Sequence, residues 1–149
     1  RITDIQCALG LSQLKKIDKF LKRNIEIKFN HPVKELIWTN TSADITTQKA
    51  KITLNGHDRF AAQDTNYFTR VQVWDHHTGF GSVSVQNSIA VYSFALKPEE
   101  HQPSGTCNFS RIDNAQLVGG TGTLADTIYA INYNVLRIMS GMGGLAYSN

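Results

Sequence analysis

Cysteine and proline are both scarce in this 149-residue sequence, which contains two cysteines and three prolines. Cys7 and Cys107 are too few for a disulfide scaffold, and their spacing matches no zinc motif. A reducing compartment is therefore the default expectation. Cys107 has no neighbouring histidine in a suitable position, so we expect a buried, inert thiol there.

Long apolar runs are also missing. No stretch of 18 or more apolar residues occurs, so no membrane-spanning helix is expected, and no signal peptide is visible. The apolar fraction of 41% and the charged fraction of 18% are typical of a globular protein and differ from the composition of disordered chains. Because Arg1 is not an initiator methionine, we expect one folded domain at the tail of a longer polypeptide.

Charge of either sign is not in large excess, since the formal net charge is +3. Much of the positive charge lies in residues 1–24, which we interpret as a link or loop segment. Leucine and isoleucine recur there at spacings of three and four, which predicts a short amphipathic helix. A solvated helix face is favoured over a phosphate-binding or lipid-binding site for its basic cluster, which consists of Lys15, Lys16, Lys19, Lys22 and Arg23.

From residue 25 onward the hydrophobic pattern changes to that of strands. Ile25, Ile27 and Phe29 alternate with charged residues, and Asn55-Gly56 predicts a tight turn after the strand KITL. The apolar segment 89–96 predicts a central strand that is buried on both faces. Further strands are predicted at VKELIWT, VSVQ, TCNFSRIDNAQLV and TIYAINYNVLRIM.

Irregular segments separate these strands. Residues 58–81 are predicted to be a long connection that packs its aromatic side chains and has room for a helical turn. GGTGT (119–123) is predicted to be a flexible loop, and a switch of apolar phase after Tyr133 predicts a bulge or bend. The glycines at 141, 143 and 144 are expected to break the chain. Together these features predict an all-β sandwich or jelly roll.

Residues typical of catalytic or metal sites do not converge in the sequence. His76 and His77 follow Asp75, but neighbouring side chains diverge on a strand or a helix, so they are poorly placed to share one ion. Glu99 and Glu100 are better explained as a solvated turn than as an acid and base pair. GGTGT lacks the ending of a phosphate-binding loop. We therefore expect no enzyme activity, no metal and no cofactor.

Two glycosylation sequons are present, at Asn40 and Asn108. Asn40 is the better candidate acceptor, because Asn108 lies in a predicted strand. Without a secretory context, neither site is expected to be modified.

The segment YSFALKPEEHQPSGTCNFSRIDNAQL closely resembles a segment near the C-terminus of the major capsid proteins of large eukaryotic DNA viruses, which include iridoviruses, phycodnaviruses and marseilleviruses. The closing INYNVLRIMSGMGGLAYSN is similar to the C-terminus of that family. ELIW, the pair Tyr67 and Phe68, and DHHTG fall where the family has comparable residues. The resemblance covers most of the chain from about Ile25 onward.

The resemblance implies a double jelly roll, three copies of which form a capsomer of hexagonal outline that tiles an icosahedral shell. By the same implication, residues 25–149 form most of the C-terminal jelly roll of a longer capsid protein. The implied partners are a homotrimer, neighbouring capsomers and minor capsid proteins, with no direct nucleic acid binding. The implied location is the virion, after assembly in the cytoplasm of an infected cell.

Within the resembling segment, the residues suit fixed turns and packing. Pro98 and Pro103 would pin a turn between two strands, and the small residues Ser104 and Gly105 would permit its backbone angles. The same motif contains Asn108, Ser110, Arg111 and Asp113. Arg111 and Asp113 flank Ile112 on a predicted extended segment, so they would pair with each other or with a neighbouring subunit. An alternative function is a carbohydrate-binding jelly-roll module that uses Trp74 and Tyr67.

Overall fold

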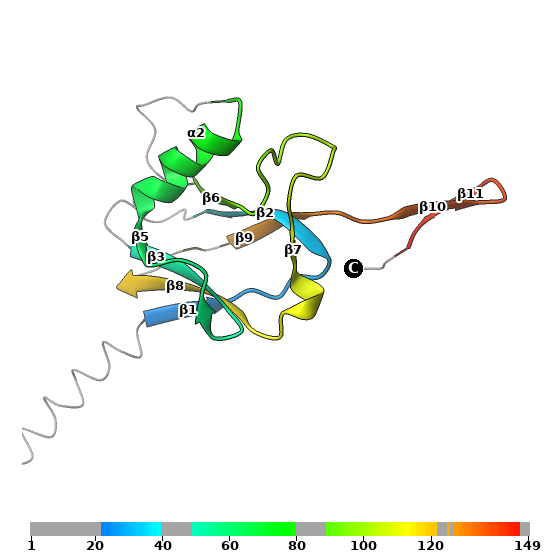
Figure 1. Cartoon of the computed structure of the whole chain (residues 1–149). Coiled ribbons are helices and arrows are strands. Elements are labelled where there is room, and N and C mark those ends of the chain that lie inside the picture. Colours follow the sequence, from blue (N-terminus) through cyan, green and yellow to red (C-terminus); the bar gives the residue numbers. More distant parts are fainter. Residues whose placement is uncertain (1–21, 40–48, 80–88, 122–124, 126, 147–149) are drawn as a thin grey trace, which may run out of the picture.

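The computed structural model describes residues 22–39, 49–79, 89–121, 125 and 127–146, and these residues form two facing β-sheets and a separate two-stranded hairpin (Figure 1). The first sheet has the strand order β1-β8-β3, and β4 and β5 both pair with β3. Its strands are β1 (Lys22–Glu26), β3 (Lys49–Leu54), β4 (His57–Asp58), β5 (Gln63–Asp64) and β8 (Ala115–Thr121).

The second sheet is organised around β2 (Pro32–Thr39), which pairs antiparallel with three other strands. Residues Glu35 to Thr39 pair with β6 and also with β9, so these two strands occupy opposite edges of β2. The start of β2 pairs with β7. The partners are β6 (Ile89–Ser93), β7 (Cys107–Asn108) and β9 (Thr127–Asn132).

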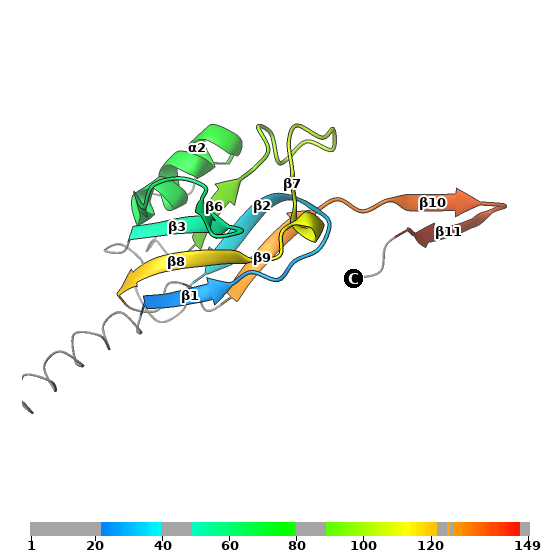
Figure 2. The same ribbon diagram turned by 60° about the horizontal axis from the view of Figure 1, so that its bottom comes forward.

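The core lies between the two sheets, as the alternation of apolar residues predicts. Leu117 of β8 pairs with Ile25 on one side and with Ile52 on the other, so these three residues share the inner face of the first sheet. In the second sheet Leu36 pairs with Tyr92 and with Ala130. Figure 2 shows the two layers from a second direction. The jelly-roll sandwich expected from the sequence is confirmed.

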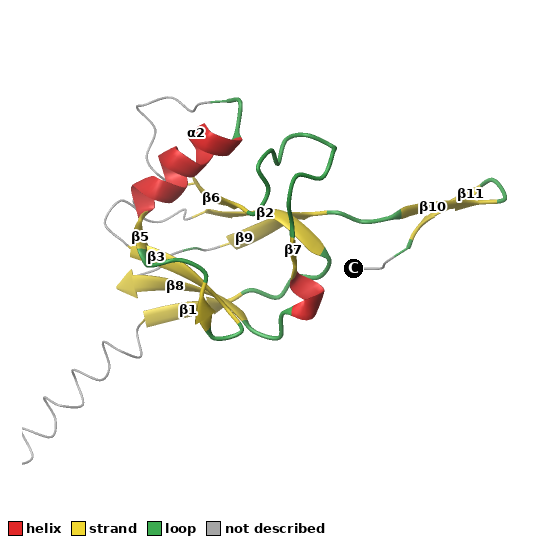
Figure 3. Ribbon diagram, viewed as in Figure 1, coloured by secondary structure: helices red, strands yellow, loops and turns green. Residues whose placement is uncertain are grey.

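A helical segment packs against the second sheet (Figure 3). It consists of the π-helical turn η2 (Tyr67–Val71), followed directly by α2 (Gln72–His76). Gln72 is buried, and its side-chain oxygen accepts a hydrogen bond of 3.1 Å from the backbone N–H of Ser93 in β6. The segment is longer than the single helical turn that the sequence suggested. Tyr67 and Phe68 are packed inward, as expected, whereas Trp74 of α2 is 71% exposed, contrary to the expectation that the aromatic side chains pack.

Aromatic rings fill the space beneath this helix. Phe68 is fully buried, and its ring centroid lies 5.2 Å from that of Trp38, 5.7 Å from that of Phe60 and 6.5 Å from that of Tyr92. Its three partners come from β2, the loop before β5, and β6. One side chain of the helix therefore joins three separate parts of the sandwich, which explains why an irregular stretch of sequence takes a defined position.

The prediction of a central strand over residues 89–96 is wrong in part. Within the described chain β6 ends at Ser93 and pairs only with β2, so β2 is the central strand. The strand ends there because the Ser93 hydroxyl donates to the carbonyl of Ala95 at 2.7 Å. The N–H groups of Phe94 and Ala95 both point to the carbonyl of Lys34. Leu96 is 73% exposed.

Glycine-rich segments also differ from their predictions. Gly119 and Gly120 lie inside β8, together with Thr121, whereas a flexible loop was expected. Gly143 and Gly144 lie in β11 (Met142–Leu145), which pairs with β10 (Leu136–Met139). Sheet pairing therefore overrides the low strand propensity of glycine at these positions.

Several other local predictions are confirmed. The hairpin between β3 and β4 turns at Asn55 and Gly56, whose φ angles are 50° and 80°. The change of apolar phase corresponds to the break between β9 and β10, at residues 133–135. The expected strand VSVQ lies outside the described residues, as does most of the amphipathic segment, although Lys22 and Arg23 belong to β1. In the described part of the chain, no helix is long and apolar enough to cross a membrane.

Replacement of Phe68 by alanine tests the aromatic packing. Phe68→Ala should lower the free energy of unfolding by about 3 to 5 kcal/mol, because a fully buried ring is lost and a cavity remains. Leu96→Ala is the control, since Leu96 is largely exposed and its change should stay within about 0.5 kcal/mol. Denaturant titration of both variants gives the measurement. Equal midpoints for the two variants would contradict the packing described here.

Candidate functional site

The segment that connects β6 to β7, residues 94–106, is the part of the sequence with the most distinctive composition. In the structure it is a loop that is held at both ends (Figure 1). The hydroxyl oxygen of Ser104 accepts a 2.9 Å hydrogen bond from the N–H of Lys97 and lies 3.2 Å from the carbonyl of the same residue. The Leu96 N–H donates to the Ser104 carbonyl. Ser104 therefore closes the loop across seven residues.

Gly105 permits the close return of the loop to β6. Its φ angle is +144°, which is in the region that favours glycine, and a Cβ atom here would lie 2.8 Å from the carbonyl oxygen of Phe94. Any larger side chain would push the two backbone segments apart. The expectation that this small residue permits special backbone angles is confirmed.

The proline side of the loop is fixed from β2. Pro98 is buried, and its carbonyl accepts a 2.8 Å hydrogen bond from the ammonium group of Lys34. The same ammonium lies 5.1 Å from the centroid of the Tyr133 ring, in a cation–π contact. Pro103 is exposed. One lysine of β2 thus joins the loop to the residues that follow β9.

The segment after the loop is not continuously extended, contrary to the prediction. Asn108 ends β7, and its side-chain oxygen accepts from the Ser110 N–H at 3.1 Å, which caps the 3₁₀ turn η3 (Phe109–Arg111). The Ser110 hydroxyl accepts from the N–H of His31 at 2.9 Å. These short polar side chains compete with sheet pairing for backbone groups, which is why the strand is interrupted.

Arg111 and Asp113 do not share an extended face, because Arg111 belongs to η3. Both are exposed, and no ion pair joins them in the described structure. Asn55 holds the following backbone, since its side-chain oxygen accepts from the N–H groups of Asp113 and Asn114 at 3.0 and 3.2 Å.

A histidine between two carboxylates joins the helix to both the sheet and the loop. The Nε2 atom of His77 lies 3.0 Å from Oε2 of Glu35, and its Nδ1 atom lies 3.1 Å from Oε1 of Glu99. The Glu35 side chain is only 4% exposed, whereas that of Glu99 is 40% exposed. The first contact lacks hydrogen-bond geometry, so it is an electrostatic contact of a buried carboxylate with the imidazole.

Thr78 completes this arrangement. Its hydroxyl donates to Oε2 of Glu99 at 2.7 Å, and its N–H donates to Oε1 at 3.1 Å. These hydrogen bonds, together with the neighbouring His77, lower the pKa of the Glu99 carboxyl below its ordinary value. The carboxylate form is therefore favoured by the folded state, which anchors the loop to the end of α2.

These groups do not form a metal site. No group of three or more metal-ligating residues is found in the described ranges. His76 and His77 diverge, as expected: Nδ1 of His76 contacts the carbonyl of Leu96 at 3.1 Å, whereas His77 faces the two glutamates. Asp75 and Glu100 are exposed, and Glu100 forms an ion pair with Lys97 on the surface. The arrangement supports structure and shows no converging acid, base and nucleophile.

The cysteine and the glycosylation sequons considered in the sequence show no sign of a reactive or modified site among the described residues. Cys107 is half-buried at the start of β7, and burial raises the pKa of its thiol, as expected for an unreactive cysteine. Asn108 is exposed, but its side-chain oxygen is used by the η3 cap. Asn40 and Cys7 lie outside the described residues.

Sequence reasoning missed the roles of Glu35, Gln72 and Asn55. The sequence did contain a sign that Glu35 needs a partner. A glutamate among the apolar residues of the strand VKELIW must be paired if that strand is buried. Nothing in the sequence identified His77 as that partner. Gln72 and Asn55 bind backbone groups far away along the chain, and such contacts have no local signature.

Comparison with known proteins places these features in a family. Residues 39–144 match the family model described as the large eukaryotic DNA virus major capsid protein. The chain is 47% identical over 160 residues to the major capsid protein of Pyramimonas orientalis virus, covering 89% of this chain and 40% of that protein. It is 39% identical over 193 residues to the major capsid protein of Paramecium bursaria Chlorella virus 1, with coverages of 85% and 43%.

A solved structure is also similar. A chain of the quasi-atomic model of the PBCV-1 virus capsid superposes with a TM-score of 0.68 at 36% identity. The superposition covers 86% of this chain and 46% of that chain. The sequence thus spans less than half the length of these relatives.

Removal of His77 tests the buried contact with Glu35. His77→Ala should lower the free energy of unfolding by at least about 1 to 3 kcal/mol, because the Glu35 carboxylate stays buried without its partner. Adding Glu35→Gln to this variant should recover part of the loss, since glutamine carries no charge. Denaturant midpoints of the single and double variants form the measurement. If the double variant is less stable than His77→Ala alone, the contact does not act in this way.

The lowered pKa of Glu99 predicts an acid dependence of stability. A carboxyl whose pKa is lowered on folding stabilises the fold above its ordinary value near 4.5, and this contribution disappears as the pH falls through the lower, folded pKa. Glu99→Gln should therefore flatten the decrease in melting temperature below about pH 4.5. Glu100→Gln is the matched control and should leave that slope unchanged. Identical slopes for the two variants would refute the assignment.

Proposed function

Because the chain belongs to the major capsid protein family of large eukaryotic DNA viruses, we propose that it is a wall-forming part of an icosahedral virion shell. The family consists of structural capsid proteins and not of enzymes. The observation that carries the proposal is the similarity in both sequence and fold to the solved capsid chain.

In this proposal, the sandwich is the C-terminal jelly roll of a double jelly-roll polypeptide, and a link or loop precedes it. The expected boundary between residues 1–24 and residues 25–149 cuts β1, so the proposed jelly roll begins with β1 at Lys22. Two observations support a separate domain. The chain covers only 46% of the solved capsid chain, which leaves room for a second domain of similar size. The described sandwich also has its own core between two sheets, so it has the properties of one domain.

The proposed binding partners belong to the whole capsid polypeptide and not to this chain alone. Three copies would form a capsomer of pseudo-hexagonal outline, and neighbouring capsomers and minor capsid proteins would complete the shell. The isolated fragment exposes large apolar side chains on β9 and beyond it, including Tyr129 and Ile131. Apolar surface of this kind favours association with another protein surface.

The loop motif would act in assembly through its shape. Lys34, Ser104 and Glu99 hold the loop at three points, so its outward side chains have defined positions. Arg111 and Asp113 are exposed beside it and have no ion pair with each other. We assign them to contacts with a neighbouring subunit. The proposed assembly motif comprises Pro98, Pro103, Ser104, Gly105, Asn108, Ser110, Arg111 and Asp113.

The alternative of a carbohydrate-binding module is weakened by the position of Tyr67. Trp74 is 71% exposed, but the Tyr67 ring packs against Phe60 and Phe68, and its hydroxyl accepts a hydrogen bond from Gln72. The two aromatic residues therefore do not form the exposed pair that stacking on a sugar requires.

Size-exclusion chromatography with light scattering tests the proposed function. The full capsid polypeptide that carries this sequence should elute as a stable trimer, whereas residues 1–149 alone should aggregate, because apolar surface and strand edges are uncovered. A monodisperse, cooperatively melting monomer from the fragment, together with a monomeric full polypeptide, would refute the assembly function. Specific binding of a glycan by that monomer would favour the alternative.

A further inference from the structure

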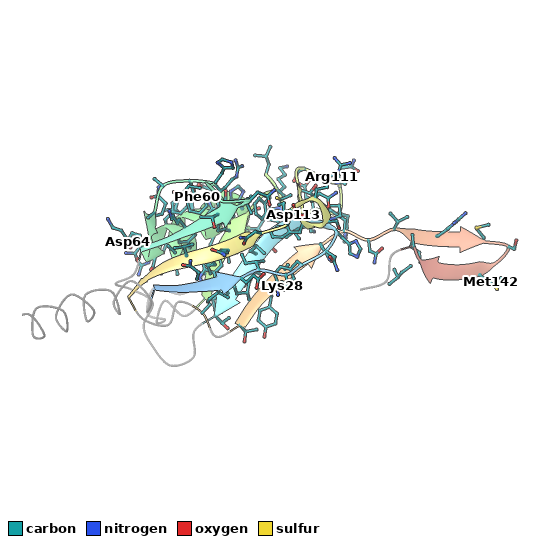
Figure 4. All side chains as sticks on the ribbon, turned by 90° about the horizontal axis from the view of Figure 1, so that it is seen from below. Lys28, Phe60, Asp64, Arg111, Asp113 and Met142 are labelled. Atoms are coloured by element: carbon teal, nitrogen blue, oxygen red, sulfur yellow. The ribbon has the colours of Figure 1, made fainter. Side chains whose placement is uncertain are left out.

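The last part of the described chain forms an arm that extends away from the sandwich. We define the C-terminal arm as residues 133–146, which contain the hairpin of β10 and β11. Figure 4 shows the hairpin beyond the body, with Met142 at its far end. Twelve large apolar side chains are exposed in the described chain, and six of them belong to this arm. These are Val135, Leu136, Ile138, Met139, Met142 and Leu145.

The hairpin has no support from the two sheets in the described structure. Its strands of four residues pair only with each other, in the register Leu136 to Leu145 and Met139 to Met142. Successive side chains of a strand point to opposite faces, so both faces of the hairpin carry apolar side chains in contact with water. A two-stranded hairpin of this kind is only marginally stable in water. A partner surface is therefore required to hold it.

Two glycines of the arm indicate how closely that surface approaches. Gly141 has a φ angle of +78° and forms the turn, so its own backbone requires glycine. Gly143 and Gly144 have no such angle, and a Cβ atom on either would meet nothing within 4 Å. Neither backbone angle nor crowding within the described chain explains them. Glycine in a strand is typical of a site where another backbone comes close.

The charge of the arm limits the chemistry of its partner. Arg137 is the only charged residue between Tyr133 and Ala146. The surface that binds the arm must therefore be largely apolar. It must also present a hydrogen-bond acceptor to the guanidinium group of Arg137. An anionic nucleic acid or membrane surface would require more positive charge than the arm carries.

We propose that the C-terminal arm docks on a second copy of the same capsid polypeptide. The arm continues from β9 and leads away from its own body in every view, so the described sandwich does not cover it (Figures 1 and 2). A shell built from many copies places a neighbour beside each subunit. The proposal rests on the proposed shell function, which supplies the second copy. Docking buries the apolar faces and brings the partner backbone against Gly143 and Gly144.

Photo-cross-linking with mixed isotopes identifies the copy that covers the arm. The full capsid polypeptide with Ile138→p-benzoylphenylalanine is prepared in ¹⁴N and ¹⁵N forms, mixed before assembly and irradiated. Docking on a second copy predicts cross-linked peptides that combine ¹⁴N with ¹⁵N. Cross-links only between peptides of one isotope would assign the arm to the other part of its own polypeptide and overturn the proposal. Assembled particles without cross-links at this position would also overturn it.

Larger side chains at Gly143 and Gly144 test whether a partner backbone lies close to β11. Gly143→Val and Gly144→Val should leave the melting temperature of the dissociated subunit unchanged, because a strand accepts valine and the space is open. Assembly should require at least a tenfold higher protein concentration. The matched control is Gly79→Val, since Gly79 also has open space and an ordinary φ angle. Assembly of the arm variants at the control concentration would overturn the proposal.

A wrong shell function and a wrong arm proposal would give different experimental results. If the unmodified polypeptide forms no trimer and no particle, the shell function is wrong and the arm proposal is wrong with it. If the unmodified polypeptide assembles and the arm variants assemble equally well, only the arm proposal is wrong.

Discussion

Strand β2 pairs on both of its edges, and this pairing determines where the other strands of the second sheet lie. β6 and β7 pair with one edge and β9 with the other, so strands from three distant parts of the chain are fixed by one segment of eight residues. Side chains of β2 also fix the positions of the helix and of the loop after β6. Trp38 packs on Phe68 of the helix, Glu35 faces His77, and the ammonium of Lys34 binds the carbonyl of Pro98.

The unusual composition of the loop after β6 follows from this pairing. The loop has to leave β6, whose Ser93 pairs with Glu35, and return to the same edge of β2 as β7, whose Cys107 pairs with Val33. Ser104 closes it, Gly105 lets it approach Phe94, and Glu99 ties it to the end of α2. The chemistry of this motif is particular because it specifies a shape. A loop that specifies a shape suits the proposed function in the wall of a shell.

Local patterns predicted much of the fold from sequence. Alternation of apolar residues identified the inner faces of both sheets, and Asn55-Gly56 identified the hairpin after β3. Predictions failed where distant contacts decide the outcome. Gly119 lies in β8 because it pairs with Ala50. Strand β6 ends at Ser93, whose hydroxyl binds the carbonyl of Ala95 while the N–H groups of Phe94 and Ala95 share the carbonyl of Lys34. The roles of exposed residues in assembly depend on partner surfaces outside this chain. The sequence could therefore indicate that such roles exist, but it could not identify the contacts.

Cryo-electron microscopy of particles assembled from the full polypeptide is the decisive measurement for the wall-forming function. We expect closed shells in whose wall this two-sheet sandwich recurs, with side-chain density for the loop after β6 closed by Ser104 and tied to α2 by Glu99. The absence of the sandwich from the wall of such particles, or a different path for the β2 strand and its three partners, would contradict it.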